Sequence, residues 1–287
     1  MKIEIYDLIH KPYPIPDDQL YVPIQPGCAE DGCKLLGGRV IRDDIGDNIS
    51  SKNKSYNMLA PMYWVWKNSR ADYVGIVHYR RLLVFKRKSK DGWKNVLTSD
   101  EALELCSNND IIFPKRSVYP FFTLRSHYIK TFKGLRKVHT LDLDTMREVI
   151  AEKFPDYLEA HDKVMSRNWG HQGNIYVMRK DLYDEHCAFM FAVLDECEKR
   201  LQGKRHDYNR YIASLAEFLP DIWCEKNNYN YIELPLFMPE EPPFLKRVLN
   251  FANRMFFGKR DPHRFDPSKY YADDKENCCV KDGPQSN

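Results

Sequence analysis

The densest group of chemically capable side chains follows the buried run in "DYVGIVHYRR", residues 72–81. The apolar residues are typical of a strand inside a sheet, and they end in a polar group, His78, Tyr79, Arg80 and Arg81. Ligands of open α/β sheets bind beyond the carboxyl ends of the strands. Because guanidinium groups grip phosphate through paired hydrogen bonds, the pattern favours a diphosphate ligand. A solvated turn with one buried tyrosine is the structural alternative.

A second candidate is "DDIGDNISSKN", residues 43–53, which crowds Asp, Asn, Ser and Gly ahead of an aromatic helix. Such side chains can bind ribose hydroxyls or the edge of a base, and Gly46 could let the backbone approach a ligand. An ordinary turn followed by a helix cap at Ser50 or Ser51 accounts for the same residues. Both interpretations remain open on the sequence.

Two further places could contact a second substrate. The loop in "NWGHQGNIYVMR" (168–179) puts a Trp, a His and two Gly just before a strand, which suits a sugar that stacks on rings. A tight turn with a buried Trp is the alternative. Glu217, in "SLAEFLP", lies in an otherwise apolar helical turn, where a carboxylate either faces solvent or serves as a base in a cleft.

The motif "LDLD" (141–144) has the form of the DxD metal motif of many sugar transferases. A carboxylate just ahead of "TMREVI" also suits the N-terminus of a helix, where it would cap free N–H groups and meet the helix dipole. We therefore interpret the motif as a helix cap.

Strands that alternate with helices predict an α/β sheet covered on both faces. The helix within 50–68 should be kinked or interrupted by Pro61, and the helix from 180 should be capped by Gly203. The expected strands are 2–6, 20–27, 72–78, 110–114, 173–179 and 231–235, and the remaining expected helices are 141–155 and 208–227.

The composition fits a globular protein of 287 residues, with 43% hydrophobic and 30% charged residues. A net charge of +3 gives no reason to expect a nucleic-acid partner. The N-terminus does not have the form of a signal peptide, and the eight Cys match no zinc pattern. We expect reduced thiols and a cytoplasmic protein.

From about residue 239 the character of the chain changes. Residues 239–270 form a basic, amphipathic extension with Phe on its apolar face, and residues 271–287 are a polar tail. Such a helix can lie at a membrane surface or pack on the preceding domain, and the pattern favours neither. The expected organisation is one domain over 1–238 followed by these two segments.

Five segments in a fixed order carry a resemblance to a known family: "HKPYPIPDDQLYVPIQPG", "DDIGDNISSKNKSYNMLAPMYWVWKN", "DYVGIVHYRR", "DIIFP" and "GHQGNIYVMRKDLYDEHCAFMFAVLDECEKR". Together they resemble a bacterial domain-of-unknown-function family from capsular and exopolysaccharide gene clusters. Its members are regarded as glycosyltransferases, some of hexosyl or galactofuranosyl type. The resemblance covers about residues 1–238.

The resemblance implies a GT-A-like fold, that is, a Rossmann-like nucleotide-diphospho-sugar transferase with a mixed sheet and helices on both faces. It places the catalytic group at His78, Arg80 and Arg81, and we add Glu217 to it as a base or acceptor ligand. The donor pocket would include His10, Lys11, Gly27, Asp47, Asn48, Asn53 and Tyr56. The 168–174 loop would hold the acceptor through Trp169, Gly170, His171, Gly173 and Asn174.

Arg80 and Arg81 occupy the strand end where related transferases carry their DxD carboxylates. Fixed guanidiniums can stabilise a departing UDP without a metal ion, so no cofactor is expected. Because His78 could be a metal ligand, a site for Mn²⁺ or Mg²⁺ is the alternative. The chain departs from the family at Met58, near which many members have an acidic residue, and at Phe218, where many have Arg.

The resulting expectation is transfer of a hexose, of galactose, galactofuranose or glucose type, from a UDP-sugar. The acceptor would be a polysaccharide or lipid-linked glycan of capsule, exopolysaccharide or O-antigen synthesis. The enzyme would be cytoplasmic, with peripheral contact to the inner face of the membrane. A non-catalytic carbohydrate- or nucleotide-binding protein that keeps the fold is the alternative.

Overall fold

The structure, a computed structural model, describes residues 1–131, 136–204 and 210–240. Met1–Pro239 form one compact unit. The predicted amphipathic extension and polar tail lie outside the described residues from position 241 onward.

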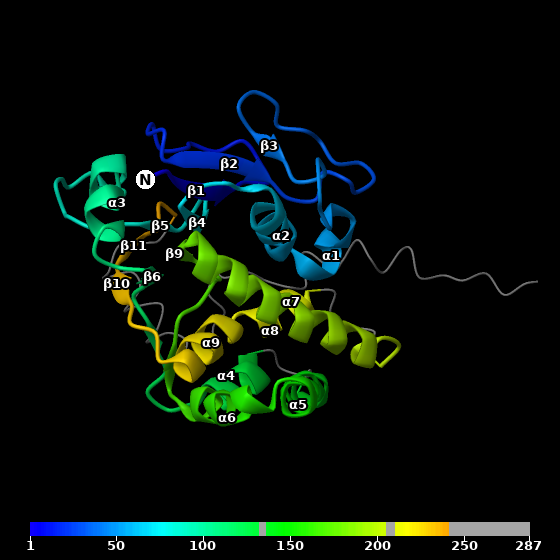
Figure 1. Cartoon of the computed structure of the whole chain (residues 1–287). Helices are drawn as coiled ribbons and strands as arrows, with labels where there is room; N and C mark the ends of the chain where they lie inside the picture. Colours follow the sequence, from blue (N-terminus) through cyan, green and yellow to red (C-terminus); the bar gives the residue numbers. More distant parts are fainter. Residues whose placement is uncertain (132–135, 205–209, 241–287) are drawn as a thin grey trace, which may run out of the picture. The chain divides into compact units, whose positions relative to one another are not determined.

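A seven-stranded mixed sheet forms the centre of this unit, in the order β10-β6-β9-β4-β1-β2-β3 (Figure 1). Every pairing is parallel except those of β9, which runs antiparallel to both β4 and β6. All six predicted strands are present, and the two-residue β3 is an addition. The strands are β1 (Ile3–Leu8), β2 (Tyr21–Gln25), β3 (Ile41–Arg42), β4 (Tyr73–His78), β6 (Ile111–Pro114), β9 (Tyr176–Arg179) and β10 (Ile232–Leu234).

Both faces of the sheet are covered, as the continuous apolar runs predict. Side chains alternate between two cores, so that Tyr6 and Ile76 belong to the larger cluster and Ile5 and Val77 to the smaller one. The larger core includes residues of α2 (Leu59–Asn68) and α7 (Lys180–Leu201), and the smaller one residues of α3 (Ser99–Cys106). α3 begins with a capping box between Thr98 and Glu101.

The remaining helices gather around α7 on the larger core (Figure 1). They are α1 (Asn53–Tyr56), α4 (Leu124–Thr131), α5 (Arg136–Lys153), α6 (Leu158–Ser166), α8 (Tyr211–Ala216) and α9 (Leu219–Asn227), with 3₁₀ turns at Ser50–Lys52, Gly92–Asn95 and Pro155–Tyr157. None of the helices within the described ranges is long and apolar enough to cross a membrane.

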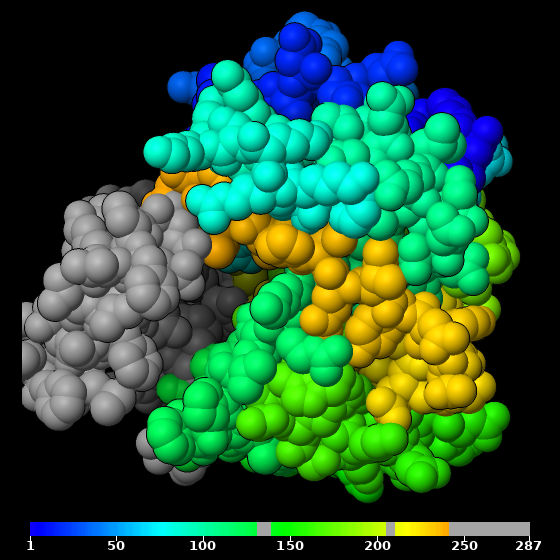
Figure 2. Space-filling model, turned by 90° about the vertical axis from the view of Figure 1, so that its left-hand side faces the viewer, coloured from blue at the N-terminus to red at the C-terminus, as the bar shows by residue number. Residues whose placement is uncertain are grey.

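Two small two-stranded sheets connect loops at the edge of the main sheet. β5 (Leu82–Leu83) pairs with β11 (Leu236–Phe237), and β7 (Ser117–Val118) pairs with β8 (Trp169–Gly170). In Figure 2 the segment after β4, in cyan, lies directly against the orange segment that contains β11. The six Cys of the described chain are free thiols.

Three predictions for the helices were wrong. The break in the 50–68 helix falls at Asn57, whose φ is 50°, and Pro61 lies inside α2. Pro61 is tolerated there because the first turn of a helix has no internal acceptor for its N–H groups. The predicted single helix over 208–227 is divided into α8 and α9 at Glu217 and Phe218.

The "LDLD" motif does not cap a helix. α5 begins earlier, at Arg136, so that residues 141–144 lie in its interior. Asp142 is buried and accepts a hydrogen bond from Tyr128 (3.2 Å), whereas Asp144 pairs with Arg125 at 2.7 Å. These carboxylates hold α4 against α5.

Candidate functional site at the carboxyl edge of the sheet

The ends of β1 and β4 bring two predicted site segments together. The two strands are parallel with Leu8 opposite His78, so that residues 9–11 and 78–81 leave the sheet at the same edge. The ring centroid of His10 lies 6.3 Å from that of His78 and 5.2 Å from that of Tyr79. The geometry brings the two predicted segments side by side, and their sharing of one site stays a prediction.

A tight turn fixes the direction of the two arginines. The backbone N–H of Arg81 donates to the carbonyl of His78 at 2.6 Å, which closes the turn. Tyr79 is only 1% exposed and anchors the turn in the protein, with the Arg80 guanidinium 5.0 Å from its ring centroid. Arg80 is half-buried and Arg81 is exposed, so both guanidiniums remain near solvent.

The electrostatic environment at this edge is strongly positive. Burial lowers the pKa of His78 to about 3, and the nearby charges of Arg81, Arg80 and Lys11 push in the same direction. Burial also lowers the pKa of His10, assisted by Arg80. Both imidazoles are therefore neutral near pH 7. Cations this close favour a bound anion at this edge of the sheet.

Arg81 extends from this turn to two residues far along the chain. Gly173 has a φ of +85°, and a Cβ built on it would lie 2.9 Å from Nη1 of Arg81. Gly173 and Arg81 both lie near the Glu217 carboxylate, because the backbone N–H of Gly173 and the charge of Arg81 each lower the pKa of Glu217. The three residues therefore form a contiguous cluster in which a cation lies beside a carboxylate.

Glu217 is the residue that follows α8, and it is half-buried. Burial raises the pKa of Glu217, while the charge of Arg81 and the Gly173 hydrogen bond oppose that rise. Burial also raises the pKa of Tyr119 to about 12, with a contribution from the Glu217 charge. Tyr119, which the sequence analysis did not single out, is thus a phenol beside the carboxylate.

Asn174 lies behind this cluster rather than in it. Its side chain is 3% exposed, its φ is 48°, and its Nδ2 contacts the sulfur of Met58 at 4.0 Å. The predicted acceptor residue Asn174 is therefore a buried neighbour of the site.

His171 has a structural environment that differs from the predicted acceptor contact. It is buried, and its Nδ1 and Nε2 lie 2.7 Å from Asp221 and 2.9 Å from Glu233. Its ring stacks on Phe113 with centroids 4.4 Å apart. Gly170 is buried beside the same group, since a Cβ there would lie 3.0 Å from Asp221. His171 and Gly170 therefore hold the 168–174 loop in place through buried contacts.

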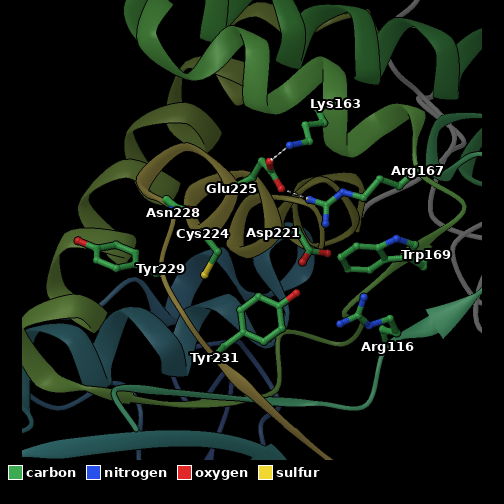
Figure 3. Close-up of a pocket in the computed structure, with 10 residues that line it drawn as sticks. All are labelled: Arg116, Lys163, Arg167, Trp169, Asp221, Cys224, Glu225, Asn228, Tyr229 and Tyr231. Atoms are coloured by element: carbon green, nitrogen blue, oxygen red, sulfur yellow. Dashed lines mark ion pairs between the residues drawn. The ribbon is translucent and has the colours of Figure 1, made fainter.

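Trp169 lines a cavity of about 460 Å³ next to this network (Figure 3). The guanidiniums of Arg116 and Arg167 lie 4.0 and 4.2 Å from its ring centroid, one on either side of the indole in Figure 3. Glu225 pairs with Arg167 at 3.5 Å and also with Lys163. The lining residues are Arg116, Lys163, Arg167, Trp169, Asp221, Cys224, Glu225, Asn228, Tyr229 and Tyr231. Aromatic rings and paired charges of this kind suit a polyhydroxylated ligand.

Gly27 and Asn53 lie together after β2, as members of the predicted donor pocket. A Cβ on Gly27, whose φ is +73°, would lie 2.4 Å from Nδ2 of Asn53. The buried carboxylate of Asp43 accepts from the backbone N–H groups of Gly27 and Cys28, each at 2.9 Å. Asp43 thus fixes the loop at the carboxyl end of β2.

The other donor-pocket predictions have local structural partners. Asn48 accepts from the backbone N–H of Ser50 at 3.2 Å, and the backbone carbonyl of Asp47 accepts from Asn68 at 2.8 Å. These contacts match the turn of the structural alternative, but the predicted helix cap at Ser50 or Ser51 is wrong. The N-caps are Ile49 and Lys52, and the Ser50 hydroxyl donates to Asp43 at 2.5 Å. Tyr56 is fully buried, and its hydroxyl donates to Asp195 of α7 at 2.8 Å, which leaves no exposed surface for a ligand.

An aromatic cluster beside the basic turn was missed on the sequence. The ring centroid of Tyr13 lies 4.6 Å from that of Tyr79 and 6.5 Å from that of Trp93. Lys11 lies 5.8 Å from the Tyr13 ring centroid. The proline-rich stretch "HKPYPIP" after the first strand was the available signal, because it holds the chain extended over the strand ends.

Strand order, a single antiparallel strand and a site at the carboxyl edge define a GT-A-like α/β fold. The family model described as "Domain of unknown function (DUF4422)" matches residues 4–228, and the chain belongs to this family. Among solved structures, the chain is similar to "WbbM bifunctional glycosytransferase apo structure", with 27% sequence identity and a TM-score of 0.75. The similarity covers 85% of this chain and 48% of WbbM, so the chain spans about half its length. No curated protein matches the chain.

Proposed function

We propose that this chain is a glycosyltransferase that binds a nucleotide-sugar at the carboxyl edge of β1 and β4. The observation that carries the proposal is the contact of Arg81 with Gly173 beside Glu217, which puts a fixed cation and a carboxylate in one cluster. The similarity to WbbM, whose title describes a bifunctional glycosyltransferase, supports this class of reaction.

In the proposed mechanism, Arg80 and Arg81 bind the diphosphate of the donor. Negative charge develops on the diphosphate oxygens as the bond to the anomeric carbon breaks, and guanidiniums held by the rigid turn stabilise it. Neutral His78 and His10 can each donate one hydrogen bond to the same group. No metal ion takes part, because the surrounding cations repel one.

Glu217 is the proposed general base. The acceptor hydroxyl forms a bond to the anomeric carbon, the nucleoside diphosphate departs with the bonding electrons, and the hydroxyl proton passes to Glu217. A carboxyl whose pKa is raised by burial accepts a proton more readily than an exposed one. Trp169 and the adjoining cavity would hold the rest of the acceptor glycan.

The finer features of the reaction follow from the family resemblance. We propose a hexose of galactose, galactofuranose or glucose type as the transferred group and UDP as the leaving group. The acceptor would be a growing polysaccharide or its lipid-linked precursor. Peripheral contact with the cytoplasmic membrane face fits such an acceptor.

The direct test is turnover. Purified protein is incubated with a panel of UDP-hexoses and free sugars, in EDTA, and UDP release and glycoside formation are followed by mass spectrometry. Transfer by wild type that is lost in Glu217→Gln supports the proposal. Binding of UDP-sugars with no hydrolysis or transfer, with any acceptor tested, would favour the non-catalytic binding protein.

A further inference from the structure

One stretch of the chain combines positive charge with the absence of acidic residues. The chain has 41 Asp and Glu residues, yet none falls between Ile111 and Leu141. The same stretch contains Lys115, Arg116, Arg125, Lys130, Lys133, Arg136 and Lys137. A run of this kind favours contact with an anionic surface.

The loop formed by residues 115–123 presents apolar side chains to solvent. Phe121 is 81% exposed, Val118 59% and Phe122 38%, which makes Phe121 the most exposed large hydrophobic residue of the described chain. Exposure of a Phe ring to water costs free energy, and three neighbouring exposed apolar side chains mark an interaction surface.

Lysines flank these apolar side chains. Lys115 and Lys130 are both exposed, and the Lys130 ammonium lies 4.4 Å from the Phe122 ring centroid. Within the described residues, neither lysine forms an ion pair. Their charges are therefore available to an external anionic partner.

The loop is connected to the candidate site. β7, which includes Val118, pairs with β8, which leads through the 169–174 loop to Gly173. Tyr119 lies close enough to Glu217 that the carboxylate charge raises the Tyr119 pKa. A partner bound by the loop would thus lie beside the mouth of the site.

We propose that the 115–123 loop is a membrane-binding surface that inserts Phe121 and Phe122 into the interface of a bilayer containing anionic lipid. Aromatic rings partition into the boundary between headgroups and acyl chains, and lysines beside them pair with anionic headgroups. A bilayer uses both features of the loop at once. The inference holds whether or not the chain transfers a sugar, and it concerns a segment distinct from the basic extension after residue 239.

The test is co-sedimentation of the full chain with vesicles, without nucleotide or sugar. Vesicles of phosphatidylcholine and phosphatidylglycerol in equal amounts are compared with vesicles of phosphatidylcholine alone. We expect binding to the mixed vesicles, a loss of roughly tenfold or more in Phe121→Ser/Phe122→Ser, and a loss of about fivefold for each of Lys115→Gln and Lys130→Gln. Leu103→Ser, which removes an apolar side chain that is 47% exposed on α3, is the matched control and should bind as wild type does.

Three results would overturn the inference. Unchanged binding of the double Phe variant would assign any membrane contact to another part of the chain. Equal binding to both kinds of vesicle would remove the role of the lysines. If single-stranded RNA displaces the wild-type chain from the vesicles, and the Phe121→Ser/Phe122→Ser variant does not bind this RNA, the surface would be assigned to nucleic acid instead. Since all the variants lie at exposed positions, an unchanged thermal unfolding midpoint is expected for each.

Discussion

Arg81 lies directly against Gly173, although the two residues come from the ends of different strands and are distant in sequence. A Cβ at residue 173 would approach Nη1 of Arg81 to 2.9 Å, so the position of the guanidinium depends on the missing side chain. The backbone N–H of the same glycine lies near Glu217 and lowers the pKa of its carboxyl. Gly173 thus sets the distance between Arg81, the proposed phosphate-binding residue, and Glu217, the proposed base.

Gly173→Ala should therefore displace Arg81. We expect UDP affinity to fall roughly tenfold, because a charge-assisted hydrogen bond is lost, and stability to fall by about 1 kcal/mol, because L residues are strained at positive φ. Gly203→Ala is the matched control, since Gly203 has a φ of +73° with nothing within 4 Å of a built Cβ. It should show the loss of stability and no loss of UDP affinity. Equal UDP affinity in both variants would contradict the proposed role of Gly173.

Glu217→Gln should reduce turnover and leave donor binding intact. General bases contribute roughly 10²- to 10⁴-fold to rate, so a fall in kcat of at least a hundredfold is expected, with the UDP dissociation constant changed less than about threefold. Because burial raises the pKa of Glu217, wild-type activity should increase with pH through a value above that of an ordinary Glu. This acidic limb should disappear from the pH–rate profile of the variant. A limb that survives would assign the base to another group.

Asp7 predicts a pH dependence of stability. It is fully buried in β1, neither carboxylate oxygen has a partner within the described chain, and burial raises its pKa to about 7. Between the ordinary pKa of 3.8 and about 7 the unfolded state binds fewer protons than the native state. The Asp7 contribution therefore falls as pH rises through that window and is constant above it.

Asp7→Asn should remove this dependence. Relative to wild type, the variant should gain stability with increasing pH, up to roughly 4 kcal/mol above pH 7, measured by urea unfolding at several pH values. Asp17→Asn, at an exposed position, is the control and should give no such trend. A constant difference between Asp7→Asn and wild type from pH 4 to 8 would show that Asp7 ionises normally.

Two of the four buried histidines of the described chain, His171 and His186, should respond differently to the same substitution. His171→Leu leaves two carboxylates, Asp221 and Glu233, without the group that joins them, so a loss of roughly 3 to 5 kcal/mol is expected. His186 has no hydrogen-bond partner for either ring nitrogen within the described chain. His186→Leu should cost at most about 1 kcal/mol or be stabilising. Similar losses in thermal or urea unfolding would refute the distinction.

The sheet was predictable because its strands are short apolar runs bounded by polar residues. "DYVGIVHYRR" also indicated the candidate site at the carboxyl edge, and the role of its two arginines stays a prediction. The helices were harder to predict. Asn57, rather than Pro61, breaks the 50–68 segment, because proline fits a first turn. α5 begins at Arg136, so "LDLD" lies inside the helix and not at its start.

The interior of the site could not be predicted, because it depends on contacts between distant segments. His171 resembles a ligand-binding residue in its loop, and only its distances to Asp221 and Glu233 reveal its structural role. In the sequence, Tyr56 resembles a residue that lines a pocket. In the structure its hydroxyl donates a hydrogen bond to Asp195 of α7, which shows that it is part of the core. Neither the sequence around Arg81 nor the sequence around Gly173 indicates by itself that the two residues are in contact.

The most direct test of the central claim is UDP binding by titration calorimetry, in EDTA and then in Mn²⁺. The account predicts that wild type binds UDP equally in both, and that Arg80→Ala/Arg81→Ala weakens binding roughly a hundredfold. Arg87→Ala/Lys90→Ala, which removes two exposed charges from the loop after β5, should bind as wild type does. Strict dependence on Mn²⁺, or equal affinity in the two double variants, would contradict an arginine-held diphosphate.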